Sequence, residues 1–314
     1  MNDQLKDVFD SESSGLDTFL GLPECSDLSQ LDAAVAIIGA PIATPYPGFG
    51  DFSATAPAAI RQEMAYYSPT VSHHDFEIDG SLLDDKFGTI VDAGDLPTSS
   101  TDFAANRAMI TNAVQQILEE GAAPIVVGGD DSIPIPVFQA FEGRGPFTIL
   151  QIDAHIDWRD EVRGERWGLS STMRRASEMP WIERIVQVGM RNFGSARTTE
   201  VEIALEWGAQ IITAQRINRE GIQLVLDLIP ADSNVLITFD CDSLDSSIMP
   251  AVMSPTPGGL TYWDIVDMMQ GVAAKANFCG FNLVEFMPAR DHNGTSALTA
   301  GRIIFNAAAL LAKK

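Results

Sequence analysis

The chain has 314 residues, 46% of them hydrophobic, which is enough to bury the core of one large α/β domain. Its formal net charge of −23 serves solubility, argues against nucleic acid or a membrane as partner, and would attract a small cationic substrate. It shows no basic leader, no run of 18 apolar residues and no disulfide framework among its three cysteines, so we expect a soluble, cytoplasmic protein.

The first 30 residues are acidic and contain several serines, which predicts an N-terminal arm. Residues 31–314 are expected to form a single domain, in which short apolar runs alternate with longer helical patterns. Eight runs are predicted strands: 35–38, 89–91, 125–127, 148–152, 185–188, 210–213, 235–239 and 280–284.

The segment between the second and third predicted strands has the pattern of a helix. Apolar residues recur at helical spacing through residues 101–120, and Gly121 follows as a stop signal. A strand, a helix and a parallel strand make a βαβ unit with helices on both faces of the sheet. The sequence therefore predicts a three-layer α/β/α fold with a predominantly parallel sheet of roughly eight strands.

Acidic residues come at or just after the ends of four predicted strands: Asp131, Asp153, Asp240 and Glu285. Ligands of parallel sheets bind beyond the carboxyl ends of the strands. We therefore expect four segments that are far apart in the sequence to converge on one edge of the sheet.

Two of these segments carry clusters, Asp153-Ala154-His155-Ile156-Asp157 and Asp240-Cys241-Asp242. Alternate residues of an extended segment point to the same side, so each cluster can aim its acids at one point. Together with Asp131 they would bring five carboxylates and one imidazole to one point, where these groups would repel one another unless cations lay between them. The pattern favours a site for two metal ions over the structural alternative, in which backbone N–H groups satisfy the buried acids.

Four ordered blocks resemble the signature segments of the ureohydrolases, the group of arginase, agmatinase and guanidinobutyrase. The blocks are Gly128-Gly129-Asp130-Asp131-Ser132, Asp153-Ala154-His155-Ile156-Asp157, Phe239-Asp240-Cys241-Asp242-Ser243-Leu244-Asp245 and Val284-Glu285-Phe286-Met287-Pro288. The resemblance covers nearly the whole chain after the arm. A metal-dependent deacetylase places a related Asp-x-His motif around a single zinc ion, but Asp157, Asp240 and Asp242 favour two ions.

The resemblance implies an arginase-like fold with two divalent ions, Mn²⁺ or Ni²⁺. Asp153 and Asp240 would each bridge both ions. His155 and Asp242 would complete one metal site, and Asp131 and Asp157 the other. Asp157 would also transfer a proton, and Glu285 would bind the guanidinium group of a small cationic substrate.

The resemblance also implies the reaction and the assembly. Such an enzyme hydrolyses a C–N bond of a guanidino compound and releases urea, or a substituted urea, with an amine or ammonia. Members of the family commonly form trimers or hexamers. We therefore expect a homo-oligomer, or a hetero-oligomer with a homologous chain.

The chain departs from the family pattern at Asp131, where the family has a metal-binding histidine. Aspartate coordinates hard ions such as Mn²⁺, but it adds negative charge, so this metal site is expected to be weakened or empty. Residues 165–176 also lack the histidine that the family usually carries there. Two functions therefore remain open: an amidinohydrolase with altered preferences, or a catalytically impaired partner subunit that supports an active homologous chain, as in a biguanide (metformin-type) hydrolase.

Two further residues are predicted to bind substrate. Trp167, like Trp158, has a ring that can line the pocket and stack on a planar cation, and His292 follows Glu285 closely enough to reach the same edge of the sheet. The structural alternatives are a tryptophan in the core or an interface, and a loop histidine.

Overall fold

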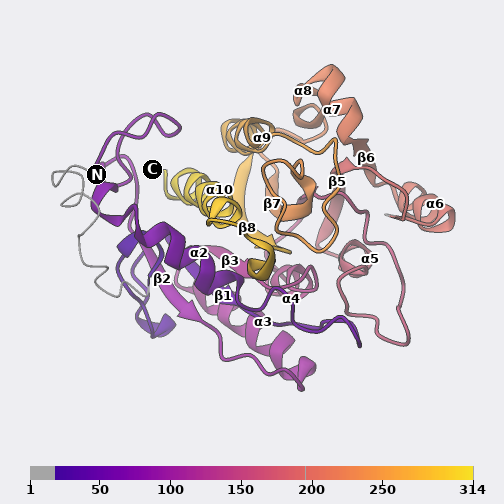
Figure 1. The fold of residues 1–314 in the computed structure, drawn as a ribbon, viewed down its shortest axis with the longest axis horizontal. Helices are drawn as coiled ribbons and strands as arrows, with labels where there is room; N and C mark the ends of the chain where they lie inside the picture. Colours follow the sequence, from indigo (N-terminus) through magenta and orange to yellow (C-terminus); the bar gives the residue numbers. More distant parts are fainter. Residues whose placement is uncertain (1–17, 195, 314) are drawn as a thin grey trace.

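The computed structural model describes residues 18–194 and 196–313. Their eight strands form one parallel sheet in the order β2-β1-β3-β8-β7-β4-β5-β6 (Figure 1). The strands are β1 (Val35–Ala40), β2 (Ile90–Asp95), β3 (Ala123–Gly128), β4 (Phe147–Ile152), β5 (Ile182–Met190), β6 (Gln210–Thr213), β7 (Asn234–Asp240) and β8 (Asn277–Val284). The carboxyl ends of all these strands lie along one edge of the sheet.

Both faces of the sheet are buried, which explains why its strands are almost continuously apolar. Successive side chains of a strand point to opposite faces. In β1, Val35 and Ile37 belong to one hydrophobic core, and Ala36 and Ile38 belong to the other.

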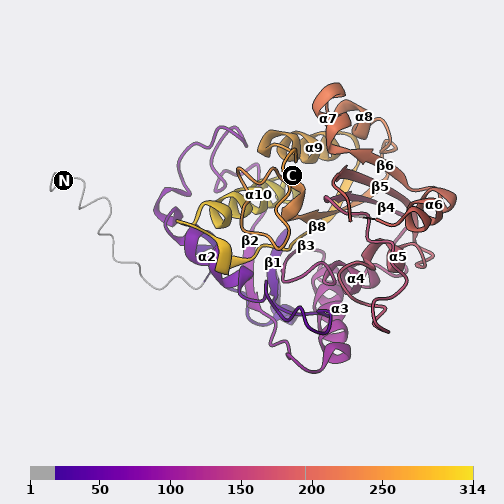
Figure 2. The same cartoon turned by 45° about the vertical axis from the view of Figure 1, so that its right-hand side comes forward.

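Helices cover both faces and complete the three layers. One core packs against α2 (Ala56–Ala65), α7 (Ala214–Glu220), α8 (Gln223–Leu226), α9 (Tyr262–Lys275) and α10 (Thr295–Ala312). The other packs against α3 (Phe103–Glu119), α4 (Pro134–Gln139), α5 (Thr172–Ala176) and α6 (Thr198–Trp207). Figure 2 shows α9 and α10 on one side of the strands and α3, α4 and α5 on the other.

The predicted fold class is confirmed, since each of the eight predicted strands overlaps one observed strand. The predicted helix over 101–120 is observed as α3. It begins after Asp102, whose carboxylate accepts a hydrogen bond from the peptide N–H of Ala105 at 3.0 Å.

The predicted arm falls into two parts. Residues 1–17 lie outside the described residues. Residues 18–30 lie against the domain: Phe19 and Leu20 are buried in the core, and the peptide N–H of Phe19 donates to Asp92 Oδ2 at 2.6 Å. This contact ties the segment to the interior of β2 through a buried carboxylate.

Within the described part of the chain, α10 alone is long and apolar enough by composition to cross a membrane. However, 67% of its apolar window is buried inside the domain, between the sheet and the neighbouring helices α2 and α9. Such burial is typical of the core helix of a globular domain.

Candidate metal centre

The loop after β3 carries Asp131 to the edge of the sheet. A Cβ atom on Gly129 would lie 2.1 Å from the carbonyl oxygen of Pro41, so only glycine allows the backbone to pass there. The peptide N–H of Glu285 donates to the carbonyl of Gly129 at 2.8 Å, and the peptide N–H of Asp131 donates to Glu285 Oε1 at 2.9 Å. These two hydrogen bonds join the loops after β3 and β8 and set Asp131 beside Glu285.

The acids after β7 lie on a tight turn. The strand ends at Asp240, and η4 (Cys241–Ser243) follows as a 3-10 turn. Asp240 Oδ1 accepts a hydrogen bond from the peptide N–H of Asp242 at 2.7 Å, which winds the chain at this point. The predicted extended geometry is therefore wrong for this cluster, although both carboxylates still reach the same edge.

The cluster after β4 also bends. The peptide N–H of His155 donates to Asp153 Oδ1 at 2.6 Å, and Asp157 has a φ of +52°. Glu285 has a φ of +67°. A positive φ is uncommon for a residue with a side chain and costs roughly 1–3 kcal/mol, so two of the predicted site residues are held in strained backbone.

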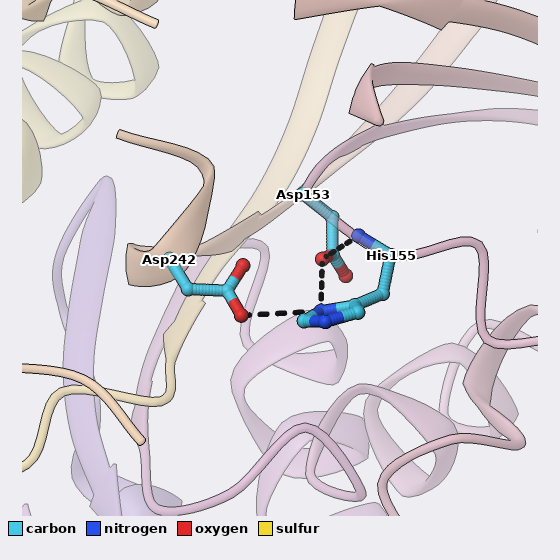
Figure 3. Close-up of side chains that lie close together, drawn as sticks. All are labelled: Asp153, His155 and Asp242. Carbon is cyan, nitrogen blue, oxygen red and sulfur yellow. Dashed lines mark hydrogen bonds and ion pairs between the residues drawn. The ribbon is translucent and has the colours of Figure 1, made fainter. Parts of the chain in front are cut away.

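Two groups of ligand atoms lie close enough together to hold metal ions. Asp153, His155 and Asp242 form the first group, and Asp131, Asp153 and Asp240 form the second; within each group the ligand atoms lie within 4.8 Å of one another. In the first, His155 Nδ1 lies 3.1 Å from Asp242 Oδ2 and 3.4 Å from Asp153 Oδ1 (Figure 3). Asp153 therefore belongs to both groups.

The acids lie beneath a cavity of about 380 Å³. Its lining includes five of the predicted metal-binding residues and the predicted substrate-binding carboxylate: Asp131, His155, Asp157, Asp240, Asp242 and Glu285. Asp157 belongs to neither three-residue group, but Gln151 Nε2 donates both to Asp157 Oδ2 at 2.7 Å and to Asp153 Oδ2 at 2.8 Å. The structure thus brings all six predicted metal-binding residues to one place.

The protonation behaviour of the acids reflects this crowding. Burial, followed by the charges of neighbouring carboxylates, raises the pKa of four carboxyl groups well above the usual value: Asp131, Asp157, Asp240 and Glu285. Burial also favours the neutral form of Asp242, but contact with His155 outweighs burial and lowers its pKa. Burial disfavours the charged form of His155, but Asp242 and Asp153 raise its pKa to about 12.

The residues fit a pair of divalent cations. Asp131 Oδ2 is buried and has no hydrogen-bond partner among the described residues, which is costly for a carboxylate oxygen unless a cation is bound. The donor set consists of carboxylate oxygens and one imidazole, and hard or borderline ions such as Mn²⁺ and Ni²⁺ accept both kinds of ligand. Divalent cations would also offset the mutual repulsion of the acids.

A chain of side-chain amides supports the acids from below. Trp158 Nε1 donates to Gln187 Oε1 at 2.9 Å, and Gln187 Nε2 donates to Gln151 Oε1, so that Gln151 directs its own N–H groups at Asp153 and Asp157. The sequence interpretation missed both glutamines. Each glutamine could have been recognised as a polar residue inside a mainly apolar strand, because a buried polar side chain requires a hydrogen-bonding partner.

Arg191 is a second supporting residue that the sequence interpretation missed. Its guanidinium group donates to the backbone carbonyls of the turn after β7, those of Asp242 at 2.7 Å, Ser243 at 3.1 Å and Leu244 at 3.0 Å. These hydrogen bonds hold the turn that carries Asp242.

Two predicted substrate-binding residues do not line the cavity. The ring of Trp167 lies 5.2 Å from the guanidinium carbon of Arg107, and its peptide N–H donates to Glu165. His292 is exposed on the loop before α10. The lining of the cavity therefore includes Trp158 but neither Trp167 nor His292.

Comparisons with known proteins agree with this fold. The sequence model of the arginase family matches residues 33–310. The chain is 29% identical to the mitochondrial arginase of Medicago truncatula over 296 residues, which cover 91% of this chain and 84% of that protein. It is 33% identical to the N(1)-aminopropylagmatine ureohydrolase of Thermus thermophilus over 196 residues, 62% of this chain and 64% of the relative.

The solved structure of arginase from Medicago truncatula superimposes with a TM-score of 0.75 at 27% sequence identity, and the match covers 91% of this chain and 90% of that one. The fold and the family match over most of the length agree with each other. The chain belongs to the arginase family.

Proposed function

We propose that this chain is an amidinohydrolase with two metal ions, which hydrolyses a C–N bond of a guanidino compound to urea, or a substituted urea, and an amine or ammonia. The observation that carries the proposal is the pair of ligand groups that share Asp153 beneath one cavity. The names of the relatives, an arginase and an aminopropylagmatine ureohydrolase, support the same reaction class.

The metal centre is proposed to use all six residues. Asp153 and Asp240 would contribute to both metal sites, with His155 and Asp242 in one and Asp131 and Asp157 in the other. When bound, a pair of Mn²⁺ or Ni²⁺ ions supplies the Lewis-acid chemistry that makes water nucleophilic near neutral pH, which the resonance-stabilised guanidinium carbon requires.

Glu285 would orient the substrate. Its Oε1 is fixed by the peptide N–H of Asp131, and the side chain lines the cavity. A carboxylate in this position accepts N–H groups of a guanidinium through charge-assisted hydrogen bonds. This contact holds the planar cation beside the metal-binding residues.

Asp157 would transfer a proton from the attacking water to the departing nitrogen. Its Oδ2 is held by Gln151, and the side chain also lines the cavity. A carboxyl group in this position can take a proton from the attacking water and deliver it to the departing nitrogen, which would otherwise leave as an unstable amide ion.

The proposal is tested by urea release from a panel of guanidino compounds after loading the purified full-length chain with Mn²⁺ or Ni²⁺. We expect about two ions per chain, as the two groups of ligands predict, and urea release from at least one compound. Absence of urea with every compound and every metal would contradict the proposed activity of this chain.

The aspartate at position 131 favours a second candidate function. A carboxylate in place of the family's histidine increases the negative charge of the centre, and the metal site that includes it would be weak. In that case the chain would be a catalytically impaired subunit of a hetero-oligomer, a trimer or hexamer in which a homologous chain performs the reaction. Such a chain releases no urea alone and co-purifies with an active homologue.

Asp131→His is expected to raise the affinity of the second metal site about tenfold, which is ~1.4 kcal/mol. The substitution removes one negative charge from the centre and supplies an imidazole, which binds Mn²⁺ and Ni²⁺. Metal content after dialysis and titration calorimetry measure the change. Asp160→His is the control, because Asp160 is exposed and pairs with arginines outside the centre. Equal metal content in Asp131→His and the unmodified chain would show that residue 131 does not bind the ions.

A further inference from the structure

The cavity is lined by charges of both signs. Its buried part consists of the carboxylates described above, whereas Arg163, which also lines it, is exposed at its mouth; Arg159 and Glu200 are the other charged residues of the lining. Because a substrate would span both parts, the charge at the mouth decides which chemical group its distal end can carry.

Glu200 is already compensated by two arginines. Its Oε2 accepts the peptide N–H of Arg197 at 2.8 Å, and its Oε1 accepts from Arg197 Nη1 at 3.2 Å. Arg159 Nε lies 3.7 Å from the same Oε1, and Glu200 is buried. Glu200 is therefore engaged in holding the start of α6 and is not available to a distal ammonium group.

Arg163 is the uncompensated cation at the mouth. The neighbouring arginines all have carboxylate partners within 4 Å: Arg159 with Glu200, and Arg166, Arg174 and Arg175 with Asp160 and Glu178. Arg163 makes no ion pair or side-chain hydrogen bond with any residue of 18–194 or 196–313, although it lines the cavity. Its Nη1 lies 3.9 Å from the position that a Cβ on Gly48 would occupy, which places the guanidinium beside the opposite rim loop.

The rest of the lining is mainly apolar. Tyr46, Phe49, Val162, Leu169 and Met253 contribute to it. A wall of this kind suits a short chain of methylene groups, because it removes them from water and offers them no polar partner.

We infer that Arg163 determines specificity for an ω-guanidino acid, a substrate with a guanidinium group at one end and a carboxylate at the other. The inference rests on the proposed function and names the substrate class of the same site. The guanidinium group binds Glu285, the methylene chain lies along the apolar wall, and the carboxylate pairs with Arg163. A substrate with a distal ammonium group would meet Arg163, an uncompensated charge of its own sign.

Calorimetric titration of the Mn²⁺-loaded full-length chain tests this assignment. The ligands are 3-guanidinopropionate and 4-guanidinobutyrate, which carry the carboxylate; n-butylguanidine, which lacks it; and agmatine, which carries an amine instead. We expect an acid to bind most tightly, and Arg163→Gln to weaken binding of that acid about fivefold, the size typical of an exposed ion pair, without changing binding of n-butylguanidine. Arg163→Lys is expected to retain most of the affinity, and Arg163→Glu to shift the preference toward agmatine.

Arg166→Gln is the matched control, since Arg166 lies on the same loop, pairs with Asp160 and does not line the cavity. The inference is overturned if agmatine binds best to the unmodified chain, if no guanidino compound binds, or if Arg163→Gln affects the acid and n-butylguanidine equally. The readout is binding, so it is separate from turnover. A chain that shows the expected binding pattern but releases no urea with any metal contradicts the proposed activity and supports the role of Arg163.

Discussion

Asp153→Asn is expected to deprive the protein of both metal ions and to lower kcat/KM for urea release at least about a thousandfold, which corresponds to ~4 kcal/mol of transition-state stabilisation. Asp153 is the one residue shared by the two ligand groups. An amide keeps the shape of the side chain but loses the negative charge and one of the two oxygens needed to bridge two cations.

Metal content per chain, measured by mass spectrometry, separates this role from a general loss of structure. His155→Asn is expected to cost one ion and Asp131→Asn the other, because each belongs to only one group. Asp160→Asn serves as the control and is expected to retain both ions, since Asp160 lies outside both groups. Two ions per chain in Asp153→Asn would contradict the shared-ligand arrangement.

Arg61→Met is expected to lower the free energy of unfolding by about 3–5 kcal/mol, the usual cost of removing one partner from a buried ion pair. Arg61 Nε lies 2.7 Å from Asp92 Oδ2, and Nη2 donates to Asp92 Oδ1 at 2.9 Å and to the carbonyl of Gly94 at 3.1 Å. A further contact joins Arg61 to Asp95. Asp92 is fully buried, so the substitution leaves its carboxylate without the opposing charge.

Urea denaturation of Arg61→Met and of the unmodified chain measures this difference in the free energy of unfolding. Arg216→Met is the control, because it removes the exposed i,i+4 pair between Arg216 and Glu220, in which both side chains are about half exposed. Such a pair contributes less than about 0.5 kcal/mol. If Arg61→Met cost no more than this control, the hydrogen bond from Phe19 and the other contacts of Asp92 would be sufficient to stabilise its charge.

The sheet and the place of the acids were predictable from the sequence. Buried parallel strands require almost continuous apolar runs, and acids that directly follow such runs can only lie at the carboxyl edge. The positions of Asp131, Asp153, Asp240 and Glu285 follow from this relation, and the structure places all four around one centre.

The local geometry of the centre was not predictable in the same way. The turn at Asp242 depends on a hydrogen bond between a carboxylate and a peptide N–H. Asp157 has a φ of +52°, and its carbonyl oxygen accepts a hydrogen bond from the peptide N–H of Arg174, in the helix α5. Trp167 illustrates the same limit. Its ring packs beside Arg107, sixty positions earlier in the chain, and does not line the cavity. Periodicity and spacing carry no information about such contacts.

The amide chain beneath the acids has a direction, and this direction limits where protons can travel. Trp158 can only donate, so it orients Gln187, which orients Gln151, and the last amide presents N–H groups to Asp153 and Asp157. Primary amides do not exchange protons readily near neutral pH, so protons do not pass through this side of the centre. A proton held by Asp157 therefore does not leave through the amide chain, whereas the cavity that Asp157 lines offers it a path to solvent or substrate.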